Sequence, residues 1–144
     1  MAENVVSNAG PLAPMRVPES EKITINLGHV DLGQVDLLVQ EGFYSNRTDF
    51  IRTAIRTRLA HHDDALRQTV ARRRLDLGLR RIGRADLEAV RDAGGRLDVQ
   101  VLGLAVIEAD VSPELALATI GSLQVLGALQ APPAVKAALA ARIR

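Results

Sequence analysis

The chain has 144 residues, which is room for one domain or two small ones. Its 18 Lys and Arg residues nearly balance 17 Asp and Glu, so any contact with nucleic acid must come from individually placed residues, because there is no bulk basic field. The sequence has no cysteine, which excludes disulfides, thiol chemistry and zinc–thiolate sites.

The start of the chain lacks the basic and apolar regions of a signal peptide, and no run of about 18 apolar residues occurs. We therefore expect a soluble, cytoplasmic protein without a membrane partner. Residues 1–20 contain Pro11, Pro14 and Pro18 among Gly, Asn and Ser and show no periodicity, which favours a flexible tail.

Residues 22–27 alternate strictly between polar and apolar side chains, the period of a half-buried strand. No second strand is predicted nearby, and a lone short strand cannot satisfy its own backbone. The same strand of a second chain is the simplest partner, and it would complete an antiparallel ribbon. One face of that ribbon would carry Lys22, Thr24 and Asn26 twice, and these residue types suit the reading of base edges in a DNA major groove. The other face would carry Ile23, Ile25 and Leu27.

Two helices are predicted after this strand. From about 31 to 41 apolar residues recur at spacings of three and four, and Gly42 fits the left-handed position that ends a helix. The second helix opens at Ser45 or Asn46, and Asp49 follows Asn46 in a capping-box pattern.

Residues 22–60 resemble the ribbon-helix-helix superfamily of bacterial transcription regulators, the CopG-like group. The resemblance rests on the strand at 22–27, the sequence EGFYSNRTDFIR at 41–52 and the Ala54-Ile55-Arg56 that follows. It implies a homodimer bound to double-stranded DNA, with Lys22, Thr24 and Asn26 in the major groove.

The resemblance also implies roles for residues of the two helices. The start of the second helix, at Ser45, Asn46 and Arg47, would hold a DNA phosphate, and a helix N-terminus offers unpaired donors for this in any fold. Arg52 could add a charge-assisted contact, whereas Arg47 could instead pair with Asp49 or Glu41. The implied dimer core consists of Ile23, Ile25, Leu27, Leu38, Phe50, Ile51 and Ile55.

Some members of this superfamily respond to nickel through a C-terminal domain with His and Cys ligands. The histidines here are His29, His61 and His62, and adjacent residues on a helix point about 100° apart, which suits a shared site poorly. We therefore expect neither a metal nor another cofactor.

Residues 73–144 contain a weak internal repeat, in which Gln100–Gly103 recurs as Gln124–Gly127, 24 residues later. Three units are predicted, at 73–96, 97–120 and 121–144, although chance matches are the alternative in a chain so rich in Ala, Leu, Val and Gly. Between the second and third units, the same displacement matches Val111, Leu115 and Ala116 with Val135, Leu139 and Ala140. Between the first and second units, it matches Leu75, Leu77 and Leu79 with Val99, Val101 and Gly103, and Asp86 with Asp110.

Each unit has the pattern of a strand followed by a short helix. Asp110 or Ser112 would cap the second helix, with Pro113 in its first turn, and Pro132-Pro133 would begin the third. The predicted strands are 75–81, 97–107 and 123–129, and the predicted helices are 86–93, 113–120 and 133–143.

These elements predict a mixed α/β fold with a ribbon-helix-helix domain at 21–72 and a C-terminal oligomerisation domain at 73–144. The C-terminal domain would be a parallel strand–helix stack like a short solenoid, with a β-solenoid or an intertwined dimer sheet as the alternatives. Because no polar unit closes its far end at Ile143-Arg144, we expect residues 97–144 to self-associate and to join dimers into higher oligomers.

No catalytic constellation, phosphate-binding loop or metal motif stands out, so we do not expect an enzyme. The favoured function is a sequence-specific repressor whose C-terminal domain supplies cooperativity. An antitoxin of a toxin–antitoxin pair ranks lower, because the C-terminal half is apolar and patterned where antitoxins carry a disordered charged tail. A nucleoid-associated architectural or segregation protein that coats DNA is the third reading.

Overall fold

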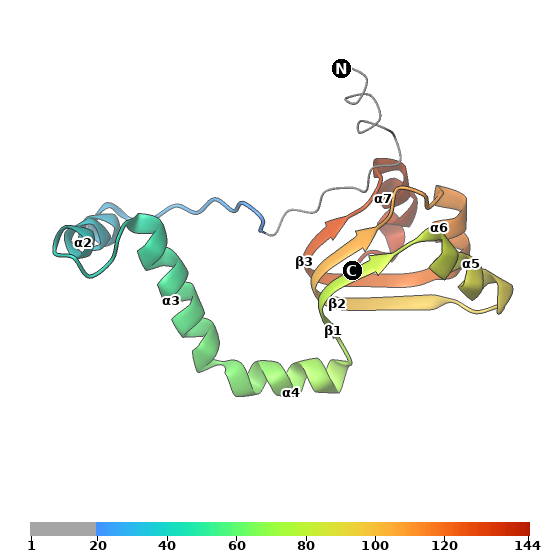
Figure 1. Ribbon diagram of the computed structural model, residues 1–144, viewed down its shortest axis with the longest axis horizontal. Coiled ribbons are helices and arrows are strands. Elements are labelled where there is room, and N and C mark those ends of the chain that lie inside the picture. Colours follow the sequence, from blue (N-terminus) through green and yellow to red (C-terminus); the bar gives the residue numbers. More distant parts are fainter. Residues whose placement is uncertain (1–19) are drawn as a thin grey trace, which may run out of the picture. The chain divides into compact units, whose positions relative to one another are not determined.

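The computed structural model describes residues 20–144, so the predicted flexible tail at 1–20 lies outside the described residues except for Ser20. One compact unit consists of Lys22–Arg73, and a second contains Arg74–Arg144. Figure 1 labels the helices and strands of both units. In the part of the chain that is described, no helix is long and apolar enough to cross a membrane.

The Lys22–Arg73 unit contains three helices, α2 (His29–Gln40), α3 (Arg47–His61) and α4 (Asp63–Arg73). After α2, Gly42 adopts the left-handed conformation that its position predicted, with a φ of 86°. His62 ends α3, and α4 begins at the next residue. Residues 63–73 therefore form a helix of their own.

Residues 22–27 form no strand in the single chain. Within the described residues this segment belongs to no helix or strand and pairs with none of the three strands. All of its side chains are exposed, and Ile23 and Ile25 are 73% and 58% exposed. The strand was predicted only with a second backbone as its hydrogen-bond partner, so one chain does not test it. For a dimer it stays a prediction.

The Arg74–Arg144 unit is built on a parallel sheet of β1 (Asp76–Ile82), β2 (Leu97–Ile107) and β3 (Ile120–Gln130), in that order. A parallel pair needs a crossover connection, and each strand here is followed by a helix. These helices are α5 (Arg84–Asp92), α6 (Pro113–Thr119) and α7 (Pro133–Leu139), and α7 continues into the short 3-10 helix η1 (Ala140–Arg142).

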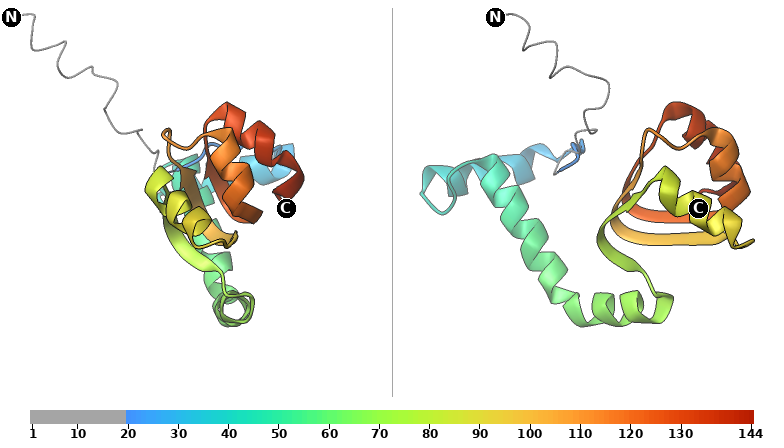
Figure 2. Two further views of the ribbon diagram at one scale, coloured as in Figure 1. Left: turned by 90° about the vertical axis from the view of Figure 1, so that its right-hand side faces the viewer. Right: turned by 45° about the vertical axis from the view of Figure 1, so that its right-hand side comes forward.

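The three helices form one layer, because α5 contacts α6 and α6 contacts α7. Figure 2 shows this layer on one side of the sheet. The core lies between the two layers, and it includes Leu87, Val101, Ile107, Leu123 and Val135, all fully buried. The order of strand and helix, three times over, is the order that the sequence predicted.

The predicted displacement of 24 residues is correct for β2 and β3, where Gln100 lies beside Gln124 and Gly103 beside Gly127. It is wrong for β1, where Gly78 lies beside Gly103, a displacement of 25 (103 − 78). The predicted match of Leu79 with Gly103 is therefore off by one residue. The register of β1 on β2 therefore follows the aligned glycines and not the alternation of leucines.

The helices do not follow the 24-residue displacement either. The first residues of α6 and α7 are Pro113 and Pro133, which lie 20 positions apart (133 − 113). The segment from β2 to α6 spans residues 108–112, whereas only 131–132 join β3 to α7, and this difference shortens the last unit. The predicted matches of Val111, Leu115 and Ala116 with Val135, Leu139 and Ala140 are therefore wrong, as is that of Asp86 with Asp110.

A ladder of three glycines crosses the sheet, since Gly78, Gly103 and Gly127 are neighbours in register. Their φ angles are 105°, 139° and 126°, in the region that favours glycine. A Cβ on Gly103 would lie 2.2 Å from the carbonyl oxygen of Gly78, and one on Gly127 would lie 2.1 Å from that of Gly103. Only glycine fits at the second and third rungs without displacing a neighbouring strand.

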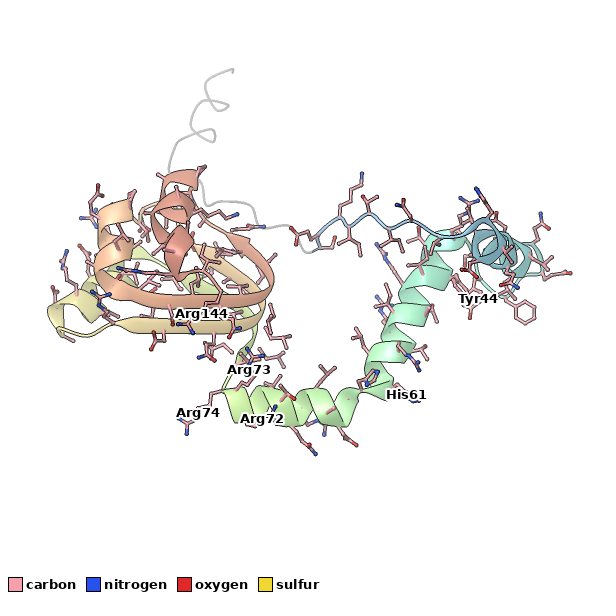
Figure 3. The ribbon with its side chains drawn as sticks, turned by 180° about the vertical axis from the view of Figure 1, so that it is seen from behind. Tyr44, His61, Arg72, Arg73, Arg74 and Arg144 are labelled. Carbon is pink, nitrogen blue, oxygen red and sulfur yellow. The ribbon has the colours of Figure 1, made fainter. Side chains whose placement is uncertain are left out.

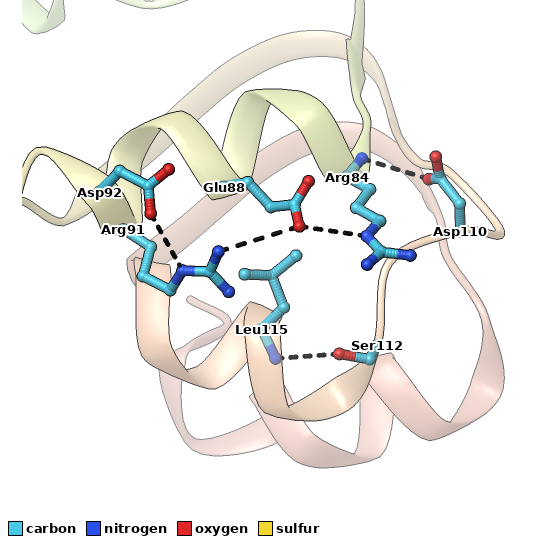
Figure 4. Close-up of polar contacts among 7 residues, drawn as sticks. All are labelled: Arg84, Glu88, Arg91, Asp92, Asp110, Ser112 and Leu115. Carbon is cyan, nitrogen blue, oxygen red and sulfur yellow. Dashed lines mark hydrogen bonds and ion pairs between the residues drawn. The ribbon is translucent and has the colours of Figure 1, made fainter.

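Two side chains fix the starts of α5 and α6 (Figure 4). Ser112 caps α6 by accepting a hydrogen bond from the amide of Leu115 at 3.1 Å, with Pro113 in the first turn. Asp110, the alternative cap, instead accepts from the amide of Arg84 at 3.2 Å and so joins the β2–α6 loop to the start of α5. Of the two predicted caps, Ser112 is the correct one.

Residues 142–144 partly cover the free edge of β3. Ile143 forms an isolated parallel bridge with Leu123, and the amide of Arg144 donates to the Leu123 carbonyl at 2.9 Å. The Arg142 guanidinium donates to the carbonyl of Ile120 at 2.8 Å. The third strand–helix unit is thus less open at its outer edge than the sequence predicted.

Candidate nucleic-acid interface

The candidate base-reading residues lie on the segment before α2. Lys22, Thr24 and Asn26 are all exposed and bear a positive charge, a hydroxyl and an amide. Since alternate residues of an extended strand point to opposite faces, these three would share one face once the segment is paired. The opposite face would then consist of Ile23, Ile25 and Leu27.

The apolar residues of this unit are incompletely buried. Val35 is its one buried residue. Leu38, Phe50 and Ile51 are half-buried, and Ile55 remains 46% exposed. The single chain therefore leaves the predicted dimer core open along both the 22–27 segment and α3. This amount of exposed apolar surface is typical of a unit that completes its core with a partner.

One aromatic pair links the α2–α3 connection to α3. The rings of Tyr44 and Phe50 meet edge to face, with centroids 5.0 Å apart. Phe43, next to Tyr44, is 70% exposed. The contact fixes the chain just before the N-terminus of α3.

The N-terminus of α3 is capped by the residues that the sequence indicated. Asn46 is the N-cap, and its side-chain oxygen accepts from the amide of Asp49 at 2.8 Å. The Asp49 carboxylate in turn accepts from the amide of Ser45 at 2.9 Å. The Ser45 amide is therefore already engaged within the turn. The amides of Arg47 and Thr48, in the first helical turn, belong to those that a helix leaves without an internal acceptor.

The Arg47 side chain is held by α2. Its Nε and Nη2 donate to the two carboxylate oxygens of Asp36 at 2.7 and 2.8 Å, a bidentate pair. This hydrogen bond lowers the pKa of Asp36 from its ordinary value, and it raises the pKa of Arg47. The predicted alternative partners, Asp49 and Glu41, are wrong. The pair ties the start of α3 to α2, so it positions the helix end.

Sequence reasoning did not identify Asp36 as a partner, because the two residues are 11 positions apart on different helices. The sequence did contain a signal for this pair, because only the short turn at 41–46 separates α2 from Arg47, the first residue of α3. An acid one turn before the end of α2, such as Asp36, lies close to that residue.

Further basic residues lie along the helices. Arg52 is exposed on α3. Arg72 and Arg73 end α4, and Arg74 follows with a φ of 53° (Figure 3). In the described chain, no group of three or more His, Cys, Asp or Glu side chains could hold a metal ion.

An amphipathic segment without a strand partner, followed by two helices with an exposed N-terminus on the second, is the arrangement expected of a DNA-binding regulator of the ribbon-helix-helix type. Residues 18–136 match the Ribbon-Helix-Helix transcriptional regulator family. The chain belongs to this family, which confirms the resemblance and identifies the protein as a DNA-binding regulator. Neither the comparison with curated proteins nor that with solved structures found a match.

The extent of the family match adds a point that the short resemblance did not contain. The resemblance covered residues 22–60, whereas the match continues through β1, β2 and β3 and ends within α7. The matched region therefore includes the parallel sheet of this chain.

Proposed function

We propose that the protein is a homodimeric, sequence-specific repressor that reads DNA with an antiparallel ribbon made of residues 22–27 from two copies. The observation that carries this proposal is the exposure of Ile23, Ile25 and Leu27, at 73%, 58% and 43%, in a unit with one buried residue. Full burial of one such side chain stabilises by about 1.5–3 kcal/mol, so six across a dimer are a strong driving force.

The dimer core proposed for this unit combines the inward face of the ribbon with the apolar side of the helices. Leu38 comes from α2, and Phe50, Ile51 and Ile55 come from α3. The half-burial of the first three of these side chains in the single chain supports a second layer of packing from the partner.

Base reading is assigned to Lys22, Thr24 and Asn26. A two-stranded ribbon fits the width of a major groove, and asparagine can bind adenine through two hydrogen bonds while lysine favours guanine. The dimer axis would present each residue twice, so the preferred DNA should contain a repeat related by two-fold symmetry.

Phosphate contact is assigned to the N-terminus of α3. We place it on the main-chain amides of Arg47 and Thr48, beside the Asn46 cap, where the helix dipole favours an anion. Ser45 would contribute its hydroxyl, since its amide is taken by Asp49. Arg52 would add its guanidinium, and Arg47 would act through its backbone because Asp36 holds its side chain.

The Arg74–Arg144 unit would join copies of the dimer and give cooperative binding. Its folded sheet argues against the antitoxin alternative, which calls for a disordered charged tail. No enzymatic step is proposed for either unit.

The test is a selection of bound fragments from random DNA, followed by affinity measurements on the selected site. Replacing Thr24 and Asn26 by alanine should remove sequence preference, at about 1–3 kcal/mol per lost base contact, and leave the dimer intact. Thr57→Ala, on an exposed face of α3, is the matched control. Affinity should also fall steeply with salt. An unchanged preference in the double variant would refute base reading by this segment.

A further inference from the structure

The parallel sheet carries two rows of apolar side chains on either side of the glycine ladder. The register places Leu77, Leu102 and Leu126 side by side, each just before a ladder glycine. Just after the glycines, it places Leu79, Leu104 and Ala128 side by side. We call these six residues the leucine rows.

The leucine rows lie on the sheet face opposite to the helices. Val101 and Ala105 of β2 are fully buried in the core beneath the helix layer. Successive residues of a strand point to opposite faces, so Leu102 and Leu104 point away from that core. Leu102 and Leu104 on the central strand are half-buried, and on the two outer strands Leu77, Leu79 and Leu126 are 72%, 57% and 42% exposed.

Only the centre of this face is apolar, since the same alternation places Gln100 and Gln124 on one side of the rows and Arg81 and Gln130 on the other. The uncovered face of a sheet is normally polar, yet none of the six side chains bears a charge or a hydrogen-bonding group. With strands about 4.8 Å apart and alternate residues about 6.6 Å apart, the rows cover on the order of 200 Å² of the sheet. Contiguous exposed apolar patches of a few hundred Å² often mark interfaces.

We propose that the leucine rows of one chain pack face to face on the leucine rows of a second copy. The six side chains themselves cannot hold DNA, because phosphates and base edges require charged or hydrogen-bonding partners. Rows repeated at the strand spacing are complementary to themselves, since a copy related by a two-fold axis can place its leucines between those of the first.

The size of the patch also favours a second copy. Two such patches would bury about 400 Å² together, which is below a standard protein interface and too little to hold two free partners. The ribbon dimer of the proposed function, on which this step rests, carries two copies of the rows on one particle. Tethering raises their effective concentration to the millimolar range, where a small apolar contact suffices.

The test uses the full chain and the absence of cysteine from the sequence. Leu102→Cys places a single thiol at the centre of the rows, and Ala89→Cys places one at an exposed position of α5 as the control. A bis-maleimide that spans the roughly 10 Å between packed sheets should join two Leu102→Cys chains and leave the Ala89→Cys chains single. Adding Leu77→Gln with Leu79→Gln should abolish the cross-link. Both side chains are exposed in the single chain, so the helix and strand content measured by circular dichroism should stay unchanged.

Three results would overturn the inference. One is a Leu102→Cys chain that sediments as a dimer without cross-linking, and another is equal cross-linking of the Ala89→Cys control. The third is a cross-link that forms only after removal of residues 1–19, which would make the start of the chain the occupant of this face.

Failure of the proposed function would look different. If the protein neither sediments as a dimer through residues 22–27 nor selects a DNA site, cross-linking at raised protein concentration still decides the inference. Ile25→Asp, which should break the ribbon, provides this condition in one variant. With the tether broken, the cross-link should vanish in dilute solution; at millimolar protein, the concentration that the tether would otherwise supply, a cross-link specific to Leu102→Cys supports the inference and its absence overturns it.

Discussion

Replacing glycines one at a time separates backbone strain from close packing in the parallel sheet. Gly95→Ala is the baseline, because Gly95 has no positive φ and a Cβ there would meet nothing within 4 Å. Gly78→Ala adds strain alone, since its φ is 105° but the space around it is open. Gly103→Ala adds both, with a φ of 139° and a Cβ only 2.2 Å from the carbonyl oxygen of Gly78.

The expected costs rise along this series. Gly95→Ala should change the free energy of unfolding by no more than about 0.5 kcal/mol. Gly78→Ala should cost about 1–3 kcal/mol, the range for a non-glycine residue in a sparsely populated region. Gly103→Ala must also move β1 away from β2 by about 1 Å, which breaks ladder hydrogen bonds worth about 1 kcal/mol each. The loss of about two such bonds brings its total to about 3–5 kcal/mol.

Urea unfolding followed by two probes measures these costs. The three aromatic residues of the sequence, Phe43, Tyr44 and Phe50, all lie in the Lys22–Arg73 unit, so tyrosine fluorescence reports on that unit. Amide exchange in β2 reports on the sheet. Gly103→Ala should weaken protection in β2 and leave the fluorescence midpoint unchanged. Equal costs for Gly78→Ala and Gly103→Ala would refute the close approach of the two strands.

Two further predictions concern single polar contacts. Asp36 has a folded-state pKa below its ordinary value of 3.8, so its pair with Arg47 stabilises above that pH and is lost as the pH falls through the lowered pKa. Asp36→Asn should therefore lower the urea midpoint of tyrosine fluorescence at neutral pH, and the gap to the wild type should close in strong acid; a gap independent of pH would contradict this. Ser112→Ala should cost about 0.5–2 kcal/mol through loss of the α6 cap, measured by amide exchange in α6. Unchanged exchange would mean that Pro113 alone sets the start of that helix.

The sequence was most informative where turn residues and periodicity agree. The predicted strand at 97–107 has the observed bounds of β2, and the Ser112-Pro113 signal placed the start of α6. The predicted helix at 133–143 is too long: α7 stops at Leu139, and Ile143 pairs with Leu123. Small residues continue a helical pattern equally well in α7 and η1, so composition alone does not reveal where the regular helix ends.

The register of β1 shows how a repeat can be aligned by the wrong feature. Alternating leucines match at a displacement of 24 residues, yet backbone conformation sets the pairing, and only the glycines can occupy the ladder. The correct signal is present in the sequence as Leu77-Gly78-Leu79 and Leu102-Gly103-Leu104. When a repeat is aligned, a glycine that the backbone conformation requires is therefore stronger evidence for the register than an apolar residue that a core prefers.

We expect both the segment at 22–27 and the leucine rows to gain a partner beyond one chain, and the sequence revealed only the first. In the first, exposed Ile23 and Ile25 alternate with polar residues, so the pattern predicts both a strand and a partner. In the second, the sequence predicted a strand at 75–81 but not which of its faces is covered. Leu77 and Leu79 are exposed because the helix layer lies on the opposite face. Alternation tells which residues share a face, whereas the topology decides which face is covered. This is why the sequence could name the ribbon as an interface but did not single out the leucine rows.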